Sequence, residues 1–353
     1  MAKSSIPKEA LQELADQLTG ELHYGKLMRV LYATDASVYR MLPLAVALPE
    51  NEDDLRILLA FARTHHTSLI LRAAGTSLAG QCVGDGIVVD ISKHFNRILE
   101  VNPEERWVRV QPGVVRDELN AFLAPHKLFF SPITSTANRA MIGGMLGNNS
   151  SGTTSIEYGT TRDKVLEVKT LLADGSTATF SDLDAEAFQQ KLQLTSLEGD
   201  IYRQMHARLS SPDQQEEIRT HFPKPSIHRR NTGYAVDALL HSSIYEPAAP
   251  PFNFGKLLAG SEGTLAITTE VKLKLDPLPF PDHVVVAAHF QSISASLQAT
   301  ITAMAHQPSA CELMDKIILD CTKENLTYRE HRFFIEADPQ AVLMVEFRAP
   351  SRN

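Results

Sequence analysis

Three glycine-rich segments constrain the fold of this chain more than any other feature of its sequence. They are RAAGTSLAG at residues 72–80, a stretch rich in Gly, Ser, Thr and Asn at residues 131–159, and GSEGTL at residues 260–265. Small residues let a backbone approach a ligand closely, and consecutive backbone N–H groups can bind an anion. None of the three has the spacing GxGxxG after a strand or GxxxxGK[ST], so a nicotinamide dehydrogenase is disfavoured.

Each segment also has a purely structural interpretation. The first can be a plain turn between two strands. The second contains the apolar patch MIGGML, which a flexible linker would lack, but Gly143 and Gly144 would also suit close packing at a helix start. The third is weak evidence alone, because glycine turns before strands are common. Taken singly, the segments leave phosphate or cofactor binding open.

Composition and charge exclude several classes of protein. The 353 residues include 34 Lys and Arg against 42 Asp and Glu, a net charge of −8, which disfavours a nucleic-acid-binding role. No run of about 18 apolar residues predicts a transmembrane segment, and the N-terminus lacks the apolar stretch of a secretory signal. Three cysteines without CxxC spacing and 13 histidines without an HExxH pattern predict no metal site. A cytoplasmic location is the default expectation.

The hydrophobic pattern predicts an α+β chain. Helices are expected at residues 7–18, 53–65, 114–124 (ending before Pro125) and, as polar stretches, up to residue 222. Strands are expected at residues 68–71 and 86–92, with hairpins around Asn102-Pro103 and Asp174-Gly175. Residues 241–255 are expected to form a surface loop. Three prolines in residues 276–282 indicate a linker, after which a small strand–helix–strand unit is expected.

Together, in this order, the glycine segments resemble the vanillyl-alcohol-oxidase/PCMH family of FAD-linked oxidases, in the branch of D-lactate dehydrogenase, the glycolate oxidase D-subunit and D-2-hydroxyglutarate dehydrogenase. RAAGTSLAG is similar to the family's R-G-G-G-T-S-x-x-G loop, and IGGMLGNNSSG…YG to its I-G-G-x-x-x-x-N-[AS]-x-G…YG loop. GSEGTLAITTEVKLKL is similar to its G-S-E-G-T-L-G-I-[IV]-T-E-x-x-L-K-L strand. YATDASVYR, RRNTGYAVDAL and CELMD also agree, so the resemblance covers about residues 32–347.

The resemblance implies a domain order. A PCMH-type FAD-binding domain of two α+β subdomains is expected at residues 31–278, after an N-terminal helical segment at residues 1–30. A partial α+β cap domain is expected at residues 279–353. Relatives continue beyond this point, so we expect the cap domain to be truncated.

The resemblance also implies which residues bind FAD. Backbone N–H groups of residues 73–77 would hold the diphosphate, the next segment would line the isoalloxazine and ribityl parts, and the last would lie by the adenine. The implied cofactor-binding residues are Arg72, Ala73, Ala74, Gly75, Thr76, Ser77, Gly80, Pro132, Ser135, Met141, Gly143, Gly144, Asn148, Gly152, Glu262, Gly263 and Ile267. Ala73 and Ala74 replace the usual glycines, which is acceptable only at negative φ.

The FAD is expected to be non-covalent. Relatives with histidyl-linked flavin have His where this chain has Thr76, and no Cys occurs between Cys82 and Cys311.

The implied function is oxidation of a D-2-hydroxy acid (D-lactate, glycolate or D-2-hydroxyglutarate class) by hydride transfer to the flavin. Electrons would leave to a quinone, a cytochrome or an iron–sulfur partner, in the cytoplasm or at the inner face of the membrane. Candidate catalytic residues are Arg229, Asn231 and Tyr234, where a guanidinium would pair with the substrate carboxylate; a solvated basic turn and a core tyrosine are the alternatives. The alternative function is an FAD-binding fragment or subunit with little activity alone. A UDP-sugar reductase is disfavoured by the GSEGTL strand.

Overall fold

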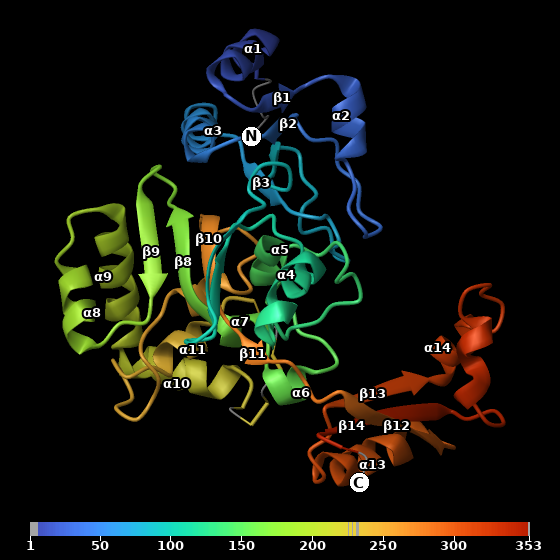
Figure 1. Ribbon diagram of the computed structural model, residues 1–353. Coiled ribbons are helices and arrows are strands. Elements are labelled where there is room, and N and C mark those ends of the chain that lie inside the picture. The colour runs from blue at the N-terminus through green and yellow to red at the C-terminus, as the bar shows by residue number, and fades with distance from the viewer. Residues whose placement is uncertain (1–5, 225, 228, 231–232, 352–353) are drawn as a thin grey trace.

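The computed structural model describes residues 6–224, 226–227, 229–230 and 233–351. Figure 1 shows an N-terminal sheet with its helices, a larger central sheet that most helices surround, and a small C-terminal sheet set apart from both. In the part of the chain that the structure describes, no helix is long and apolar enough to cross a bilayer.

The N-terminal unit is a four-stranded sheet whose central strands are β2 (Ala45–Leu48) and β4 (Ile87–Asp90). Its outer strands are β1 (Glu21–His23), antiparallel to β2, and β3 (Leu69–Arg72), parallel to β4. Strand β4 is buried throughout, as its continuous apolar run predicts for a parallel strand covered on both faces. The unit also contains α1 (Lys8–Gln17), α2 (Lys26–Leu31) and α3 (Glu52–Thr64).

Local sequence explains why α3 begins where it does. Asn51 is its N-cap, and its side chain accepts hydrogen bonds from the backbone N–H groups of Asp53 and Asp54. Acidic residues in the first turn stabilise the helix, because their negative charge lies near the positive end of the helix dipole. Leu55 and Leu58 recur at helical spacing and are fully buried against the sheet.

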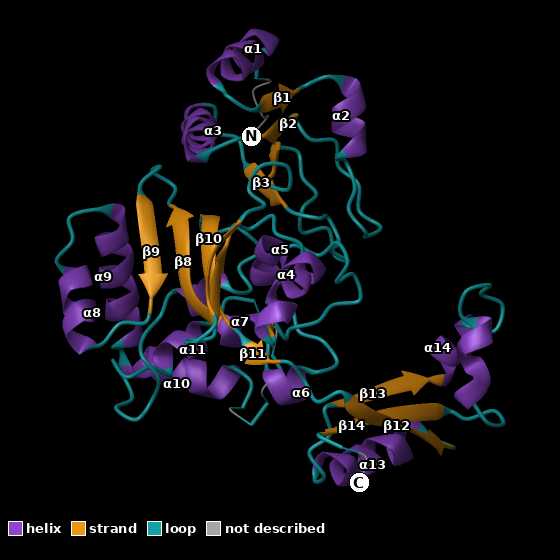
Figure 2. Ribbon diagram, viewed as in Figure 1, coloured by secondary structure: helices purple, strands orange, loops and turns teal. Residues whose placement is uncertain are grey.

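The central unit is an antiparallel sheet in the order β5-β6-β10-β8-β9. Its strands are β5 (Ile98–Asn102), β6 (Trp107–Val110), β10 (Ile267–Lys274), β8 (Val165–Leu171) and β9 (Thr177–Ser181). A two-stranded pair, β7 (Leu128–Phe129) with β11 (Asp276–Pro277), lies beside it. Its helices, most of which are labelled in Figure 2, are α4 (Arg116–Leu123), 3-10 helix η1 (Ala124–His126), α5 (Ile142–Asn148), α6 (Ser155–Tyr158), α7 (Thr161–Lys164), α8 (Ala185–Leu192), α9 (Leu197–Leu209), α10 (Pro212–His221), α11 (Val236–Leu240) and α12 (Gly255–Leu258).

The C-terminal unit is an antiparallel sheet in the order β12-β14-β13. Its elements are β12 (Asp282–Phe290), α13 (Ile293–Met304), β13 (Ala310–Asp315), α14 (Lys316–Cys321), 3-10 helix η2 (Arg329–Phe334) and β14 (Ala341–Ala349). Asp315 caps α14 by accepting a hydrogen bond from the Ile318 N–H.

The predicted α+β class is confirmed, including both hairpins. Two local predictions are wrong, and one helix end is confirmed: α4 ends at Leu123, before Pro125, which lies in the separate 3-10 helix η1. Pro7 is the N-cap of α1 and not its first residue. Residues 241–255 do not stay at the surface, because Phe252 and Phe254 turn into the aromatic core around Tyr202. The domain limits at residues 31 and 279 stay predictions; β1, within residues 1–30, pairs with β2.

Candidate functional site

The first glycine segment leaves β3 and forms a tight loop. Gly75 and Gly80 have φ angles of 64° and 78°, in the left-handed region that favours glycine. Ala73 and Ala74 have negative φ, which is the condition for alanine to replace the family's usual glycine at these positions. The loop is tied to the preceding segment because the Ala36 N–H donates to the Gly75 carbonyl at 3.1 Å.

The second segment enters the short helix α5. Gly143 packs directly on Pro112: its N–H donates to the Pro112 carbonyl at 2.7 Å, and a Cβ added to it would lie 2.5 Å from the Pro112 Cβ. The next glycine, Gly144, faces the first segment, since its added Cβ would lie 3.3 Å from the Cβ of Ala73. Gly143 thus serves close packing, as the structural interpretation proposed, and that packing brings α5 against the first loop.

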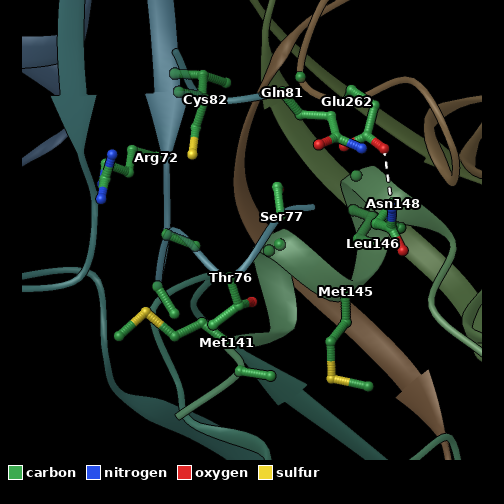
Figure 3. Close-up of a pocket in the computed structure, with 18 of the residues that line it drawn as sticks. Arg72, Thr76, Ser77, Gln81, Cys82, Met141, Met145, Leu146, Asn148 and Glu262 are labelled. Atoms are coloured by element: carbon green, nitrogen blue, oxygen red, sulfur yellow. Dashed lines mark hydrogen bonds between the residues drawn. The ribbon is translucent and has the colours of Figure 1, made fainter. Parts of the chain in front are cut away.

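The third segment meets the end of α5. The Gly260 N–H donates to the Leu146 carbonyl at 3.0 Å, and the Glu262 N–H to the Gly147 carbonyl at 2.9 Å. The Asn148 side-chain amide donates to Glu262 Oε1 at 3.0 Å (Figure 3). The segment turns through left-handed conformations, with φ of 99° at Gly260, 51° at Glu262 and 71° at Gly263.

These contacts bring all three segments onto one cleft of about 440 Å³. This volume is within the usual range for ligand sites. Most of the residues predicted to bind the cofactor line it: Arg72, Ala73, Ala74, Gly75, Thr76, Ser77, Ser135, Met141, Gly143, Gly144, Asn148, Glu262, Gly263 and Ile267. In Figure 3 the Arg72 side chain points away from the other labelled residues, which surround the opening.

Three predicted cofactor residues lie outside the lining of this cleft. Gly80 packs against Tyr39, and its added Cβ would lie 2.9 Å from that ring. Gly152 packs on the Ile133 carbonyl, 2.1 Å from its added Cβ. Pro132 is buried, and its carbonyl accepts a hydrogen bond from Arg116 Nε at 3.1 Å. All three residues contact other parts of the chain and do not line the cleft.

The cleft includes residues that the sequence did not single out. Thr134 has a buried Oγ1 for which the described part of the chain offers no hydrogen-bond partner. Cys82 lines the cleft beside Gln81, and burial raises the pKa of its thiol. Arg139 lines it as a second cation, with Arg72. Residue type alone does not identify these positions as cleft residues. Only Thr134 could have been suspected from the sequence, because it lies in a Ser/Thr-rich loop.

The lining fits a large, partly anionic cofactor. Small residues leave the backbone of the first loop accessible, Met141 and Met145 provide apolar surface, and Arg139 provides positive charge. The unpartnered Thr134 hydroxyl is a free donor or acceptor for a bound group. A dinucleotide with an apolar ring system and a diphosphate meets each of these features.

A second cavity of about 380 Å³ borders the start of the first loop. It shares Arg72, Ala73, Ala74, Arg139 and Met141 with the cleft, and Tyr32 and Asp90 complete its polar wall. This cavity was not predictable from the sequence, because Tyr32 and Asp90 are 58 positions apart.

Of the candidate catalytic residues, Arg229 and Tyr234 are not in the cleft lining. Arg229 is exposed, and the neighbouring Arg230 forms an ion pair with Asp237. Tyr234 is also exposed, and its hydroxyl lies 2.6 Å from Thr264 Oγ1, in the third segment. Asn231 lies outside the described residues. The structure thus places Tyr234 beside the site and does not bring Arg229 to it.

Two family models match the chain. One, "FAD binding domain", matches residues 43–181, and the other, "FAD linked oxidases, C-terminal domain", matches residues 281–353. The first match spans the first two glycine segments and strands β2 to β9. The second begins at the C-terminal unit.

Similar proteins include a dehydrogenase, an oxidase subunit and a solved structure that shares the fold. D-2-hydroxyglutarate dehydrogenase of Pseudomonas putida is 37% identical over 98% of this chain and 34% of that protein. Glycolate oxidase subunit GlcD of Bacillus subtilis is 27% identical over 91% of this chain and 55% of that protein. The chain therefore spans about one third of the length of the curated dehydrogenase. An alkyldihydroxyacetonephosphate synthase structure matches the whole chain with a TM-score of 0.64 at 16% identity, which shows a shared fold.

Proposed function

Because this chain belongs to the FAD-linked oxidases, we propose that it binds FAD in the cleft between its three glycine segments and oxidises a small D-2-hydroxy acid. The observation that carries the proposal is the convergence of residues 72–82, 134–150 and 258–268 on one cleft. The relatedness to D-2-hydroxyglutarate dehydrogenases supports the substrate class.

In this proposal, different groups of cleft residues bind different parts of FAD. Residues 73–77 offer backbone N–H groups to the diphosphate, because their side chains are small and Gly75 has a positive φ. Met141, Met145 and the Thr134 hydroxyl line the part suited to the isoalloxazine. Glu262, Gly263 and Ile267 line the end suited to the adenine and its ribose.

When bound, FAD supplies a two-electron acceptor for the hydride that leaves the substrate carbon. The chain's own contribution is to bind and orient the partners. We keep Arg229, Asn231 and Tyr234 as candidates for substrate contact. The bond of Tyr234 to Thr264 supports its position beside the third segment. The proposed electron acceptor is a quinone, a cytochrome or an iron–sulfur protein.

Turnover tests the substrate class directly. The FAD content of the purified protein is measured first, and D-lactate, glycolate and D-2-hydroxyglutarate are then offered with an artificial dye as electron acceptor. We expect reduction of the dye with at least one of these acids and none with L-lactate or L-2-hydroxyglutarate. An FAD-loaded protein that reduces no dye with any of them contradicts the proposed activity.

A second candidate is an FAD-binding subunit that turns over only with a partner. The apolar exposure of the C-terminal unit favours it: Val284, Leu297, Ile301 and Phe333 are 57%, 56%, 75% and 88% exposed. Exposed apolar surface of this kind is typical of interaction sites. The same assay separates the two candidates, because the subunit would bind FAD and lack dye reduction.

A further inference from the structure

Arg72 and Asp90 are aligned in register on the neighbouring parallel strands β3 and β4. Asp90 is only 6% exposed, and opposite charges so placed would normally form an ion pair. They do not pair, because Tyr32 intervenes. The Tyr32 hydroxyl donates to Asp90 Oδ2 at 2.6 Å, and the Ser92 N–H donates to Oδ1 at 2.8 Å.

The Tyr32 ring also holds Arg72. The Arg72 Cζ lies 5.1 Å from the centre of the ring, within the range of a cation–π contact. Nη1 donates to the Thr34 carbonyl at 2.8 Å. The guanidinium is thereby held against Gly75, since a Cβ added to Gly75 would lie 2.5 Å from Nη2.

The charge of Arg72 is therefore not neutralised by a carboxylate. In the part of the chain that the structure describes, Arg72 forms no ion pair. Its positive charge lies against Gly75, within residues 73–77, which line the cleft. A fixed cation behind such a loop attracts an anion more strongly than a cation already paired with a carboxylate.

We infer that Tyr32 is a positioning residue for the cofactor diphosphate: by binding Asp90 it prevents this carboxylate from pairing with Arg72, and it keeps the guanidinium against Gly75. This inference rests on the proposed location of the FAD diphosphate at residues 73–77. It assigns a role in anion binding to a pair of residues, Tyr32 and Asp90, that line the second cavity and not the cleft.

The test measures the dissociation constants of FAD and of ADP from the apoprotein by calorimetry. ADP carries the adenosine and the diphosphate without the flavin, so it reports on diphosphate binding independently of the isoalloxazine. The variants are Tyr32→Phe, which keeps the ring and removes the hydroxyl, Asp90→Asn, and the double variant. Tyr24→Phe is the matched control, because its hydroxyl donates to Gln12, away from the cleft.

We expect Tyr32→Phe to weaken both ligands about tenfold, since the freed carboxylate pulls Arg72 into an ion pair. Asp90→Asn alone should bind at least as tightly as the wild type. Adding Asp90→Asn to Tyr32→Phe should restore affinity to within about twofold, because no carboxylate remains to capture Arg72. Tyr24→Phe should leave both constants unchanged.

A merely structural role gives a different pattern. If the hydrogen bond only stabilises the sheet, both single variants lose affinity and the double variant is at least as weak as either; that result overturns the inference. Asp90→Asn decides the question if Tyr32→Phe does not fold. A wild-type protein that binds neither FAD nor ADP would instead reject the proposed cofactor site, before any variant is compared.

Discussion

The side-chain amide of Asn148 donates a 3.0 Å hydrogen bond to the carboxylate of Glu262, and this bond joins the second and third glycine segments at the cleft (Figure 3). The two residues are 114 positions apart. The backbone supports the same junction, because the Glu262 N–H donates to the Gly147 carbonyl. The bond therefore holds the second segment to the third where both line the cleft.

Breaking this junction should weaken FAD binding. Asn148→Ala removes the donor, and we expect the dissociation constant of FAD to rise three- to tenfold, about the net value of one ordinary hydrogen bond. Asn148→Asp should be worse, because two carboxylates would then face each other. Fluorescence titration of the apoprotein with FAD measures both. Asn325→Ala, which removes a turn cap in the C-terminal unit, is the control. Unchanged affinity in Asn148→Asp would mean that the junction does not shape the site.

Sequence reasoning identified the segments because their function depends on local residue type. A loop that must expose its backbone needs Gly, Ala, Ser and Thr, and these residues are visible in RAAGTSLAG without any fold. The helices and hairpins were likewise predictable from apolar spacing and from the turns at Asn102-Pro103 and Asp174-Gly175. Such signals lie within about ten residues of one another.

The remaining features depend on packing between distant segments. Gly80 and Gly152 look like ligand-binding glycines in sequence, but they are required by Tyr39 and Ile133. Cys82 reaches the cleft only because the loop folds back from β3, and its sequence neighbours do not reveal this. The 241–255 loop enters the core because Phe252 and Phe254 complete an aromatic cluster formed with α8 and α9. No local pattern encodes these contacts.

Two glycines should not tolerate a β-branched side chain. Gly75→Val introduces a Cβ at positive φ and within 2.5 Å of Arg72, and Gly143→Val introduces one within 2.5 Å of Pro112. We expect each to lower FAD occupancy at least tenfold, because the first loop must shift away from Arg72 in one variant and α5 must shift away from Pro112 in the other. The flavin-to-protein absorbance ratio of the purified protein measures occupancy.

Gly25→Val provides the matched comparison for these two variants. Gly25 has a φ of −72°, and nothing lies within 4 Å of an added Cβ. The FAD occupancy of Gly25→Val should equal that of the wild type. Should Gly75→Val or Gly143→Val retain full flavin while remaining folded, the location of the cofactor between the first loop and α5 is wrong.

The FAD should leave the protein intact on denaturation. Thr76 lines the cleft where histidyl-linked relatives have His, and a threonine hydroxyl does not form that bond. We expect acid precipitation to release all of the flavin into the supernatant, where its mass equals that of free FAD. Cys82 also lines the cleft, so Cys82→Ser serves as the check and should release flavin identically. Flavin that remains with the precipitated wild-type chain would contradict this prediction.

The thiol of Cys82 should be a weaker acid than an ordinary thiol, and it should therefore be alkylated more slowly. Burial raises its pKa above the ordinary value of 9.0, so at a given pH less of it is the reactive thiolate. In a Cys311→Ser/Cys321→Ser background, its alkylation by iodoacetamide should be at least tenfold slower than that of glutathione at pH 8. The rate should still rise between pH 9 and 10, where glutathione levels off, and bound FAD should slow it further. In urea the difference should vanish. A native Cys82 whose rate levels off at the same pH as that of glutathione would show that the cleft wall does not bury this thiol.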